Sequence, residues 1–98
     1  MAEIRWTKEA AAWLEDIYDY ISEDSEQLAF RVVDSIYQKT QILRQHPKIG
    51  YKYRSEPEGE IRILLYGHYR IAYLLADIDS IIILGVFHGA LDIERYLE

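Results

Sequence analysis

The sequence has no cysteine and no apolar run long enough to span a membrane. Without thiols, neither disulfide bonds nor thiolate metal sites can form, and this composition fits the reducing cytoplasm. A membrane-spanning helix needs about 18–20 consecutive apolar residues. The N-terminal stretch MAEIRWTKEA also lacks the apolar segment of a signal peptide. We therefore expect a cytoplasmic protein that does not cross a membrane.

Positive charge is scarce, because 11 Lys and Arg residues stand against 17 Asp and Glu residues and give a net charge of −6. A protein that binds phosphate backbones by itself is usually basic, whereas an acidic protein is repelled from them. We therefore expect no direct binding to free nucleic acid. Lys48, Lys52 and Arg54 form a local basic exception between the two prolines, Pro47 and Pro57.

Half of the 98 residues are apolar or aromatic, so the chain can build one hydrophobic core but is too short for two. We expect a single domain over residues 1–98. Alternation of Ala2, Ile4 and Trp6 with charged residues predicts a short, half-buried strand at the start of this domain.

Two stretches with apolar residues at helical spacing follow this strand. Thr7 stands where an N-cap belongs, and the spacing predicts an amphipathic helix over residues 7–22. Ser25 or its neighbour Asp24 can cap a second helix. We expect this helix to reach His46, because the proline after it disfavours helical geometry in the preceding residue. Only a few residues join the two helices, so they should fold back as an antiparallel hairpin.

The C-terminal half changes to a strand pattern. Residues 47–59 contain two Pro and two Gly, which predicts a loop. Three β-rich segments separated by turns come next, at residues 61–66, 69–76 and 81–87. Residues 91–97 could form one or two helical turns. The sequence thus predicts an α+β fold with an N-terminal strand, an antiparallel helical hairpin and a three-stranded antiparallel meander.

A two-residue turn at Gly67-His68 sets the register of the first predicted β-hairpin. It pairs Tyr66 with Tyr69 and places Arg62 opposite Tyr73, because side chains alternate between the two faces of a sheet.

This register divides the side chains of the hairpin between two faces. One face carries Arg62, Leu64, Tyr66, Tyr69, Ile71 and Tyr73, and the other carries Ile61, Ile63, Leu65, Arg70, Ala72 and Leu74. We expect the second face to lie under the helices. Arg70 would then sit at its rim, where it can reach water or a helix carboxylate such as Asp16 or Asp19.

The sequence contains no motif of a metal or cofactor site. The three histidines form no zinc-helix motif, and neither a glycine-rich phosphate-binding motif nor a serine at a strand-to-helix elbow occurs. We therefore expect no metal and no cofactor. The remaining candidates are cationic and aromatic residues near the predicted sheet: Lys52, Tyr53, Arg54, Arg62, Arg70, Tyr73 and His88. Each also has an ordinary structural interpretation, such as ion pairing, cross-strand packing or an exposed basic loop.

Three stretches, in this order and spacing, resemble the ParE/RelE toxin superfamily. IRWTKEAAAWLEDIYDYI is similar to its opening strand and first helix, and ILRQHPKIG is similar to its L-x-x-x-P-x-x-G junction. YRIAYLLADIDSIIILGVFHGALD is similar to its Y-R-I-x-Y strand, acidic turn, apolar strand and V-x-H ending. The resemblance covers nearly the whole chain and implies a toxin of a type II toxin–antitoxin pair.

The resemblance leaves two activities open. RelE-like members are ribosome-dependent endoribonucleases that cut mRNA, and for them the resemblance implies catalytic roles for Arg70, His88 and a further basic residue, Arg62. Such residues would transfer protons at the 2′-hydroxyl and stabilise the charge of the transition state. ParE-like members instead bind DNA gyrase and block it without bond-making of their own.

Three features favour the ParE-like branch. The predicted hairpin is long, the net charge of −6 is poor for docking onto ribosomal RNA, and the stretch after Gly50 offers tyrosines and cations but no carboxylate base. The arginine that many relatives carry after the V-x-H histidine is also missing, because Gly89-Ala90-Leu91-Asp92 stands there. We expect a gyrase inhibitor that acts by protein binding. A fold that only binds its antitoxin is a third alternative.

This interpretation implies two binding surfaces. We expect the antitoxin to bind along the hairpin and the sheet edge at Trp13, Ile17 and Tyr20, through a segment that contains compensating Lys or Arg. We expect the target to contact Lys52, Arg54 and Tyr73.

Overall fold

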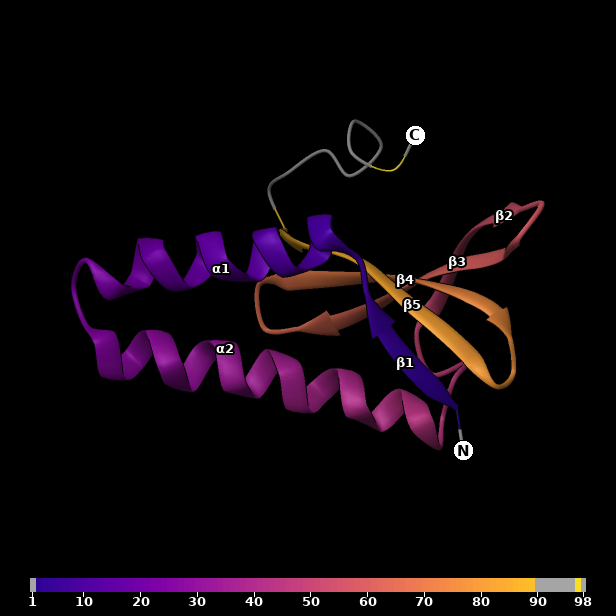
Figure 1. Cartoon of the computed structure of the whole chain (residues 1–98), viewed down its shortest axis with the longest axis horizontal. Coiled ribbons are helices and arrows are strands. Elements are labelled where there is room, and N and C mark those ends of the chain that lie inside the picture. The colour runs from indigo at the N-terminus through magenta and orange to yellow at the C-terminus, as the bar shows by residue number, and fades with distance from the viewer. Residues whose placement is uncertain (1, 90–96, 98) are drawn as a thin grey trace.

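The computed structural model describes residues 2–89 and residue 97, and it has an α+β fold in which two helices pack on one five-stranded sheet. The elements are β1 (Glu3–Trp6), α1 (Lys8–Ser22), α2 (Glu26–Gln41), the 3₁₀ helix η1 (Ile42–Arg44), β2 (Tyr51–Glu56), β3 (Gly59–Tyr66), β4 (Tyr69–Asp77) and β5 (Ser80–His88). The strand order is β1-β5-β4-β3-β2. The two helices run antiparallel, and the tip of their hairpin projects beyond the sheet (Figure 1). The expected fold class is thus confirmed.

Both helices begin at the caps that the sequence predicts. The side-chain oxygens of Thr7 and Ser25 accept hydrogen bonds from the amides of Ala10 and Leu28, each at 3.0 Å. These bonds satisfy amide groups that lack partners within the first helical turn. The second helix is shorter than expected, because its last residues tighten into the 3₁₀ helix η1, as helix C-termini often do.

The expectation of a loop over residues 47–59 is wrong for Tyr51–Glu56, because these residues form the strand β2. Pro47 and Pro57 lie outside this strand, and Pro57 begins the turn that leads into β3. Within the part of the chain that the structure describes, β2 has only one strand neighbour, β3. A register shift beside Tyr53 also interrupts the ladder. An edge strand with a bulge needs no strict apolar alternation, so its pattern is weak in the sequence.

The expected register of the β3–β4 hairpin is confirmed. Tyr66 pairs with Tyr69, and Arg62 lies opposite Tyr73. The expected orientation is wrong, because the face that carries Tyr73 is the one that meets the helices. The residues of this core include Ala10, Ile36, Leu43, Leu64, Ile71, Tyr73, Ile81, Ile83 and Val86.

The opposite face of the sheet is also apolar, and this explains the error. Its buried cluster consists of Ile61, Ile63, Ala72, Phe87 and Leu97. Because both faces of β3 and β4 carry large apolar side chains, alternation alone does not indicate which face the helices cover. Arg70 therefore lies on the face away from the helices, and its Nη2 donates to the carbonyl oxygen of Gly89 at 3.2 Å.

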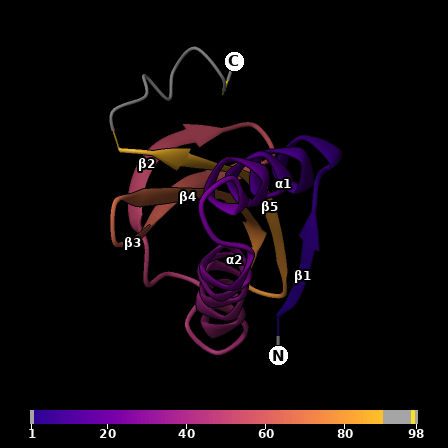
Figure 2. The same ribbon diagram turned by 90° about the vertical axis from the view of Figure 1, so that its left-hand side faces the viewer.

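The N-terminal strand β1 is short, so it pairs with only the first half of β5 at one edge of the sheet. β1 pairs with β5 in parallel from Glu3 opposite Ser80 to Trp6 opposite Ile83. The chain then enters α1, which runs along the remainder of β5 in place of a strand. Figure 2, viewed along the helices, shows the hairpin with β1 on one side of the view and β2 on the other.

No helix in the described part of the chain is long and apolar enough to cross a membrane. The helical turns expected over residues 91–97 lie outside the described residues except for Leu97. Leu97 packs with Phe87 in the cluster on the sheet face that carries Arg70, and its carbonyl oxygen accepts a hydrogen bond from Arg54 Nη2.

Candidate functional site

A groove lies where α1 replaces a strand beside β5. Its volume is about 350 Å³, and its lining consists of Trp13, Asp16, Ile17, Tyr20, Tyr69, Val86 and His88. The three residues expected to bind an antitoxin, Trp13, Ile17 and Tyr20, all line this α1 groove. Tyr20 is 77% exposed, so a large aromatic surface is available to a partner.

Aromatic contacts fix the walls of the α1 groove. Trp13 packs edge-on against Phe87 with ring centroids 4.9 Å apart, and Tyr69 packs edge-on against His88 at 5.9 Å. Partial burial, with a smaller contribution from Tyr20, raises the pKa of Tyr69 above its usual value, so its hydroxyl stays protonated at neutral pH. The walls of the groove are therefore uncharged at Tyr69 and well packed at Trp13.

The helical hairpin carries most of the net charge of the protein. Residues 8–41 contain three Lys or Arg against eight Asp or Glu, a net charge of −5 out of −6 for the whole chain. Asp16 lies in the α1 groove itself. A partner that docks along the hairpin is therefore favoured if it carries positive charge around its apolar residues.

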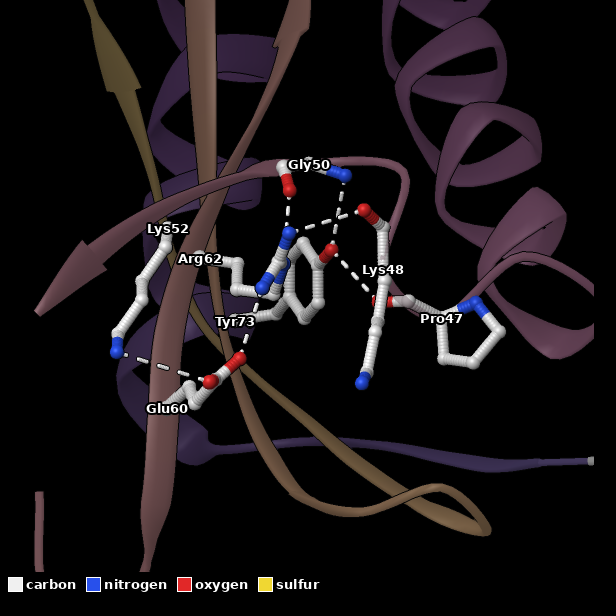
Figure 3. Close-up of polar contacts among 7 residues, drawn as sticks. All are labelled: Pro47, Lys48, Gly50, Lys52, Glu60, Arg62 and Tyr73. Carbon is white, nitrogen blue, oxygen red and sulfur yellow. Dashed lines mark hydrogen bonds and ion pairs between the residues drawn. The ribbon is translucent and has the colours of Figure 1, made fainter. Parts of the chain in front are cut away.

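A second constellation fixes the connection between η1 and β2 (Figure 3). Arg62 donates from Nε to the carbonyl oxygen of Gly50 at 2.7 Å and from Nη2 to that of Lys48 at 3.1 Å. The Tyr73 hydroxyl donates to the carbonyl oxygen of Pro47 at 2.8 Å and accepts from the amide of Gly50 at 3.0 Å. Two side chains of the sheet therefore hold the backbone of residues 47–50, which we call the latched loop.

The residues expected to bind the target differ in how far they are available to a partner. Tyr73 is fully buried, and burial raises the pKa of its hydroxyl, so it offers no surface to a partner. Arg54 pairs with Glu56 at 2.7 Å and with the carbonyl oxygen of Leu97. Lys52 extends into solvent with half of its side chain exposed. Of the three, Lys52 is the most available for a direct contact.

The three residues of the nuclease alternative do not line one common groove. Arg62 is on the helix-facing side of β3 and grips the latched loop, whereas Arg70 is on the opposite side of the sheet. His88 lines the α1 groove, which neither arginine lines. Among the described residues, no group of three or more His, Cys, Asp or Glu could hold a metal ion.

Comparison with known proteins agrees with this fold. The family described as "ParE toxin of type II toxin-antitoxin system, parDE" matches residues 4–93. The chain belongs to the ParE toxin family. The resemblance to the ParE/RelE superfamily is thereby confirmed, and its ParE branch is the one that matches.

A solved ParE-related structure is also similar. It is described as the "Chromosomal ParDE TA system from P. aeruginosa", with a TM-score of 0.70 and 27% sequence identity over 90% of this chain and 96% of that chain. No curated protein sequence matches significantly. The ParE fold therefore extends over most of both chains.

Sequence reasoning missed part of both constellations. It did not find Asp16, Tyr69 and Val86 as members of the α1 groove, because only the packing of α1 against β5 brings them together. It also did not predict the latched loop, although Gly50 gave a signal. A Cβ atom at position 50 would lie 2.7 Å from the carbonyl oxygen of Ile63, so only glycine fits there without a shift.

Proposed function

We propose that this ParE-family protein is a toxin that inhibits DNA gyrase by binding it, and that a cognate antitoxin neutralises it. The observation that carries the proposal is that, within a chain of the ParE family, Arg62 holds the latched loop, Arg70 lies on the face of the sheet away from the helices and His88 lines the α1 groove. General acid–base chemistry on RNA needs its groups within hydrogen-bond reach of one reacting centre. Binding a protein target needs only an exposed surface.

The α1 groove is the proposed antitoxin site. Interfaces are often anchored by a few aromatic residues in well-packed pockets, and Trp13 and Tyr20 supply such residues here. The net charge of −5 on residues 8–41 supports an antitoxin segment whose apolar residues are flanked by Lys or Arg. The cytoplasmic location remains a prediction from the cysteine-free sequence.

The experiment for this proposal is a supercoiling assay with purified gyrase and relaxed plasmid. We expect the protein to inhibit supercoiling at micromolar concentration, and a prior incubation with the antitoxin to restore it. Unchanged supercoiling at micromolar concentration, with a correctly folded protein, would contradict the proposed target.

A RelE-like nuclease is the second candidate, because Arg70 and His88 occupy neighbouring rungs of the β4–β5 ladder. It requires that mRNA is cut in the ribosomal A site and that Arg70→Ala abolishes the cutting while the fold survives. Primer extension on mRNA after induction distinguishes the two candidates. A fold that only binds its antitoxin would give neither effect, and its expression would leave growth unchanged.

A further inference from the structure

The latched loop presents an apolar side chain to solvent from a backbone that hydrogen bonds hold in place. Ile49 is 52% exposed, and its amide donates to the carbonyl oxygen of His46 at 3.1 Å. The flanking backbone is held by Arg62 and Tyr73. An interface residue that is already ordered loses little conformational entropy when it binds. The backbone of the latched loop is thus ordered before a partner binds, which suits it to serve as a contact surface.

An apolar cleft adjoins Ile49. It has a volume of about 420 Å³, and its lining consists of His46, Pro47, Lys48, Ile49 and Ile78. Ile78, in the turn between β4 and β5, is 65% exposed. Asp77 and Asp79 flank Ile78 along the chain, so the cleft has an acidic boundary on that side. A cleft of this kind can accept one apolar side chain of a partner.

Positive charge lies on the other side of Lys48. Arg62 donates from Nη1 to Glu60 Oε1 at 2.8 Å, and Lys52 Nζ lies 3.8 Å from Glu60 Oε2. The hydrogen bond from Arg62 lowers the pKa of Glu60, and Lys52 and Lys48 lower it further. Three cations around one carboxylate give the side of the loop at Glu60 a net charge of +2, whereas Asp77 and Asp79 give the Ile78 side of the cleft a charge of −2.

We propose that the latched loop, together with Lys52 and Ile78, binds an acidic segment of the target protein and receives one of its apolar side chains in the cleft. This proposal rests on the proposed function, because it names the surface through which the toxin engages its target. The charge pattern orients the complex: the acidic residues of the segment are attracted by Lys48 and Lys52, and they are repelled by Asp77 and Asp79 beside Ile78 and by the hairpin, with its net charge of −5.

A protein is favoured over a nucleic acid as the occupant of this surface. The cleft is lined mainly by apolar side chains, which would contribute little to binding a phosphate backbone. Neutralising a phosphate backbone usually takes several Lys or Arg contacts, and the neighbouring hairpin repels such a backbone. An exposed apolar residue beside two lysines instead matches a segment in which Asp or Glu flanks a large apolar residue.

The test uses the double variant Lys48→Glu/Ile49→Asp, which changes the two exposed residues of the latched loop. Its control is Lys8→Glu/Leu28→Asp, which makes the same charge changes at exposed positions of the hairpin outside the α1 groove. Gyrase supercoiling, growth arrest on expression and antitoxin binding are measured for both. We expect the loop variant to need at least about tenfold more protein for inhibition, as expected on loss of an interface hot spot. Its antitoxin affinity should stay within about twofold, and the control should behave as the wild type.

Three outcomes separate this inference from the proposed function. If the wild type inhibits gyrase and the loop variant inhibits equally well, the surface is wrong and the function stands. If the wild type arrests growth without affecting gyrase, the target is wrong, and loss of arrest in the loop variant still supports the surface. If wild-type protein cuts mRNA and the loop variant does not, the surface binds RNA and the inference is overturned. Should the double variant lose antitoxin binding, the milder Lys48→Ala and Ile49→Ser variants replace it in the same assays.

Discussion

The hydroxyl of Tyr73 donates a hydrogen bond to the carbonyl oxygen of Pro47 at 2.8 Å, between two residues 26 positions apart. Together with Arg62, it connects the middle of the sheet to the chain that leaves the helices. Arginine and tyrosine at these positions suggest catalysis or target contact when only the sequence is known. In the structure they hold the backbone of the latched loop, and the loop carries the exposed residues.

Tyr73→Phe should destabilise the fold. The change removes a hydroxyl that satisfies the Pro47 carbonyl and the Gly50 amide, and a buried polar group left without a partner costs about 1–3 kcal/mol. Urea denaturation followed by circular dichroism measures the loss. Tyr20→Phe is the matched control, because its ring is 77% exposed and its change should stay within about 0.5 kcal/mol. Equal stability of the two variants would show that the hydroxyl does not hold the loop.

Gly50→Ala should destabilise the protein through steric overlap. The new Cβ would lie 2.7 Å from the Ile63 carbonyl oxygen and 2.8 Å from the Tyr73 hydroxyl oxygen, so the latched loop must shift. We expect a loss of about 1–3 kcal/mol, measured as a lower thermal midpoint. Gly67→Asn is the comparison, since this turn residue has φ of +56° and open space around it, and asparagine tolerates that conformation. A Gly50→Ala variant as stable as Gly67→Asn would rule out the close contact.

Tyr20→Ala should weaken antitoxin binding and leave the toxin folded. Tyr20 lines the α1 groove yet is 77% exposed, so its truncation removes partner contacts and few internal ones. We expect at least about a tenfold higher Kd by calorimetry, the usual effect of losing an aromatic anchor. Phe30→Ala is the control, because Phe30 is 66% exposed on α2 and does not line this groove. An unchanged Kd in Tyr20→Ala would place the antitoxin away from the α1 groove.

Glu60 should contribute to stability in a pH-dependent way. Its folded-state pKa is lowered, first by the hydrogen bond from Arg62, so its stabilising contribution is present above the unfolded-state pKa. That contribution is lost as the pH falls through the folded-state pKa. Glu60→Gln should therefore be less stable than the wild type at neutral pH, and the difference should shrink in acid. The midpoints of urea denaturation, determined from acid to neutral pH, measure this difference in stability. Glu58→Gln, a change at an exposed neighbour, is the control. A difference that is constant with pH would contradict the assigned ion pairs.

The sequence was sufficient for the elements with strong local signals. Thr7 and Ser25 cap the helices as predicted, and the Gly67-His68 turn sets the register that pairs Arg62 with Tyr73. These features depend on residues close together in the chain, so propensity and alternation are enough to predict them.

Features that depend on distant packing were not predictable in this way. β2 is an edge strand with a bulge at Tyr53, which blurs its alternation, and the apolar residues on both faces of β3 and β4 concealed which face meets the helices. Trp13 and Tyr20, expected to contact an antitoxin along the hairpin, do line one groove beside α1. The buried role of Tyr73 was missed, because its hydrogen-bond partners lie 23 and 26 residues away.

The central claim is that this ParE-family toxin acts through protein contacts and has no reaction centre at Arg70 and His88. The most direct measurement is the inhibition of gyrase supercoiling by the purified Arg70→Gln/His88→Ala variant, with circular dichroism to verify its fold. The predicted result is inhibition at the same concentration as the wild type. A folded variant that no longer arrests growth, beside a wild type that cuts mRNA and leaves gyrase active, would contradict the claim.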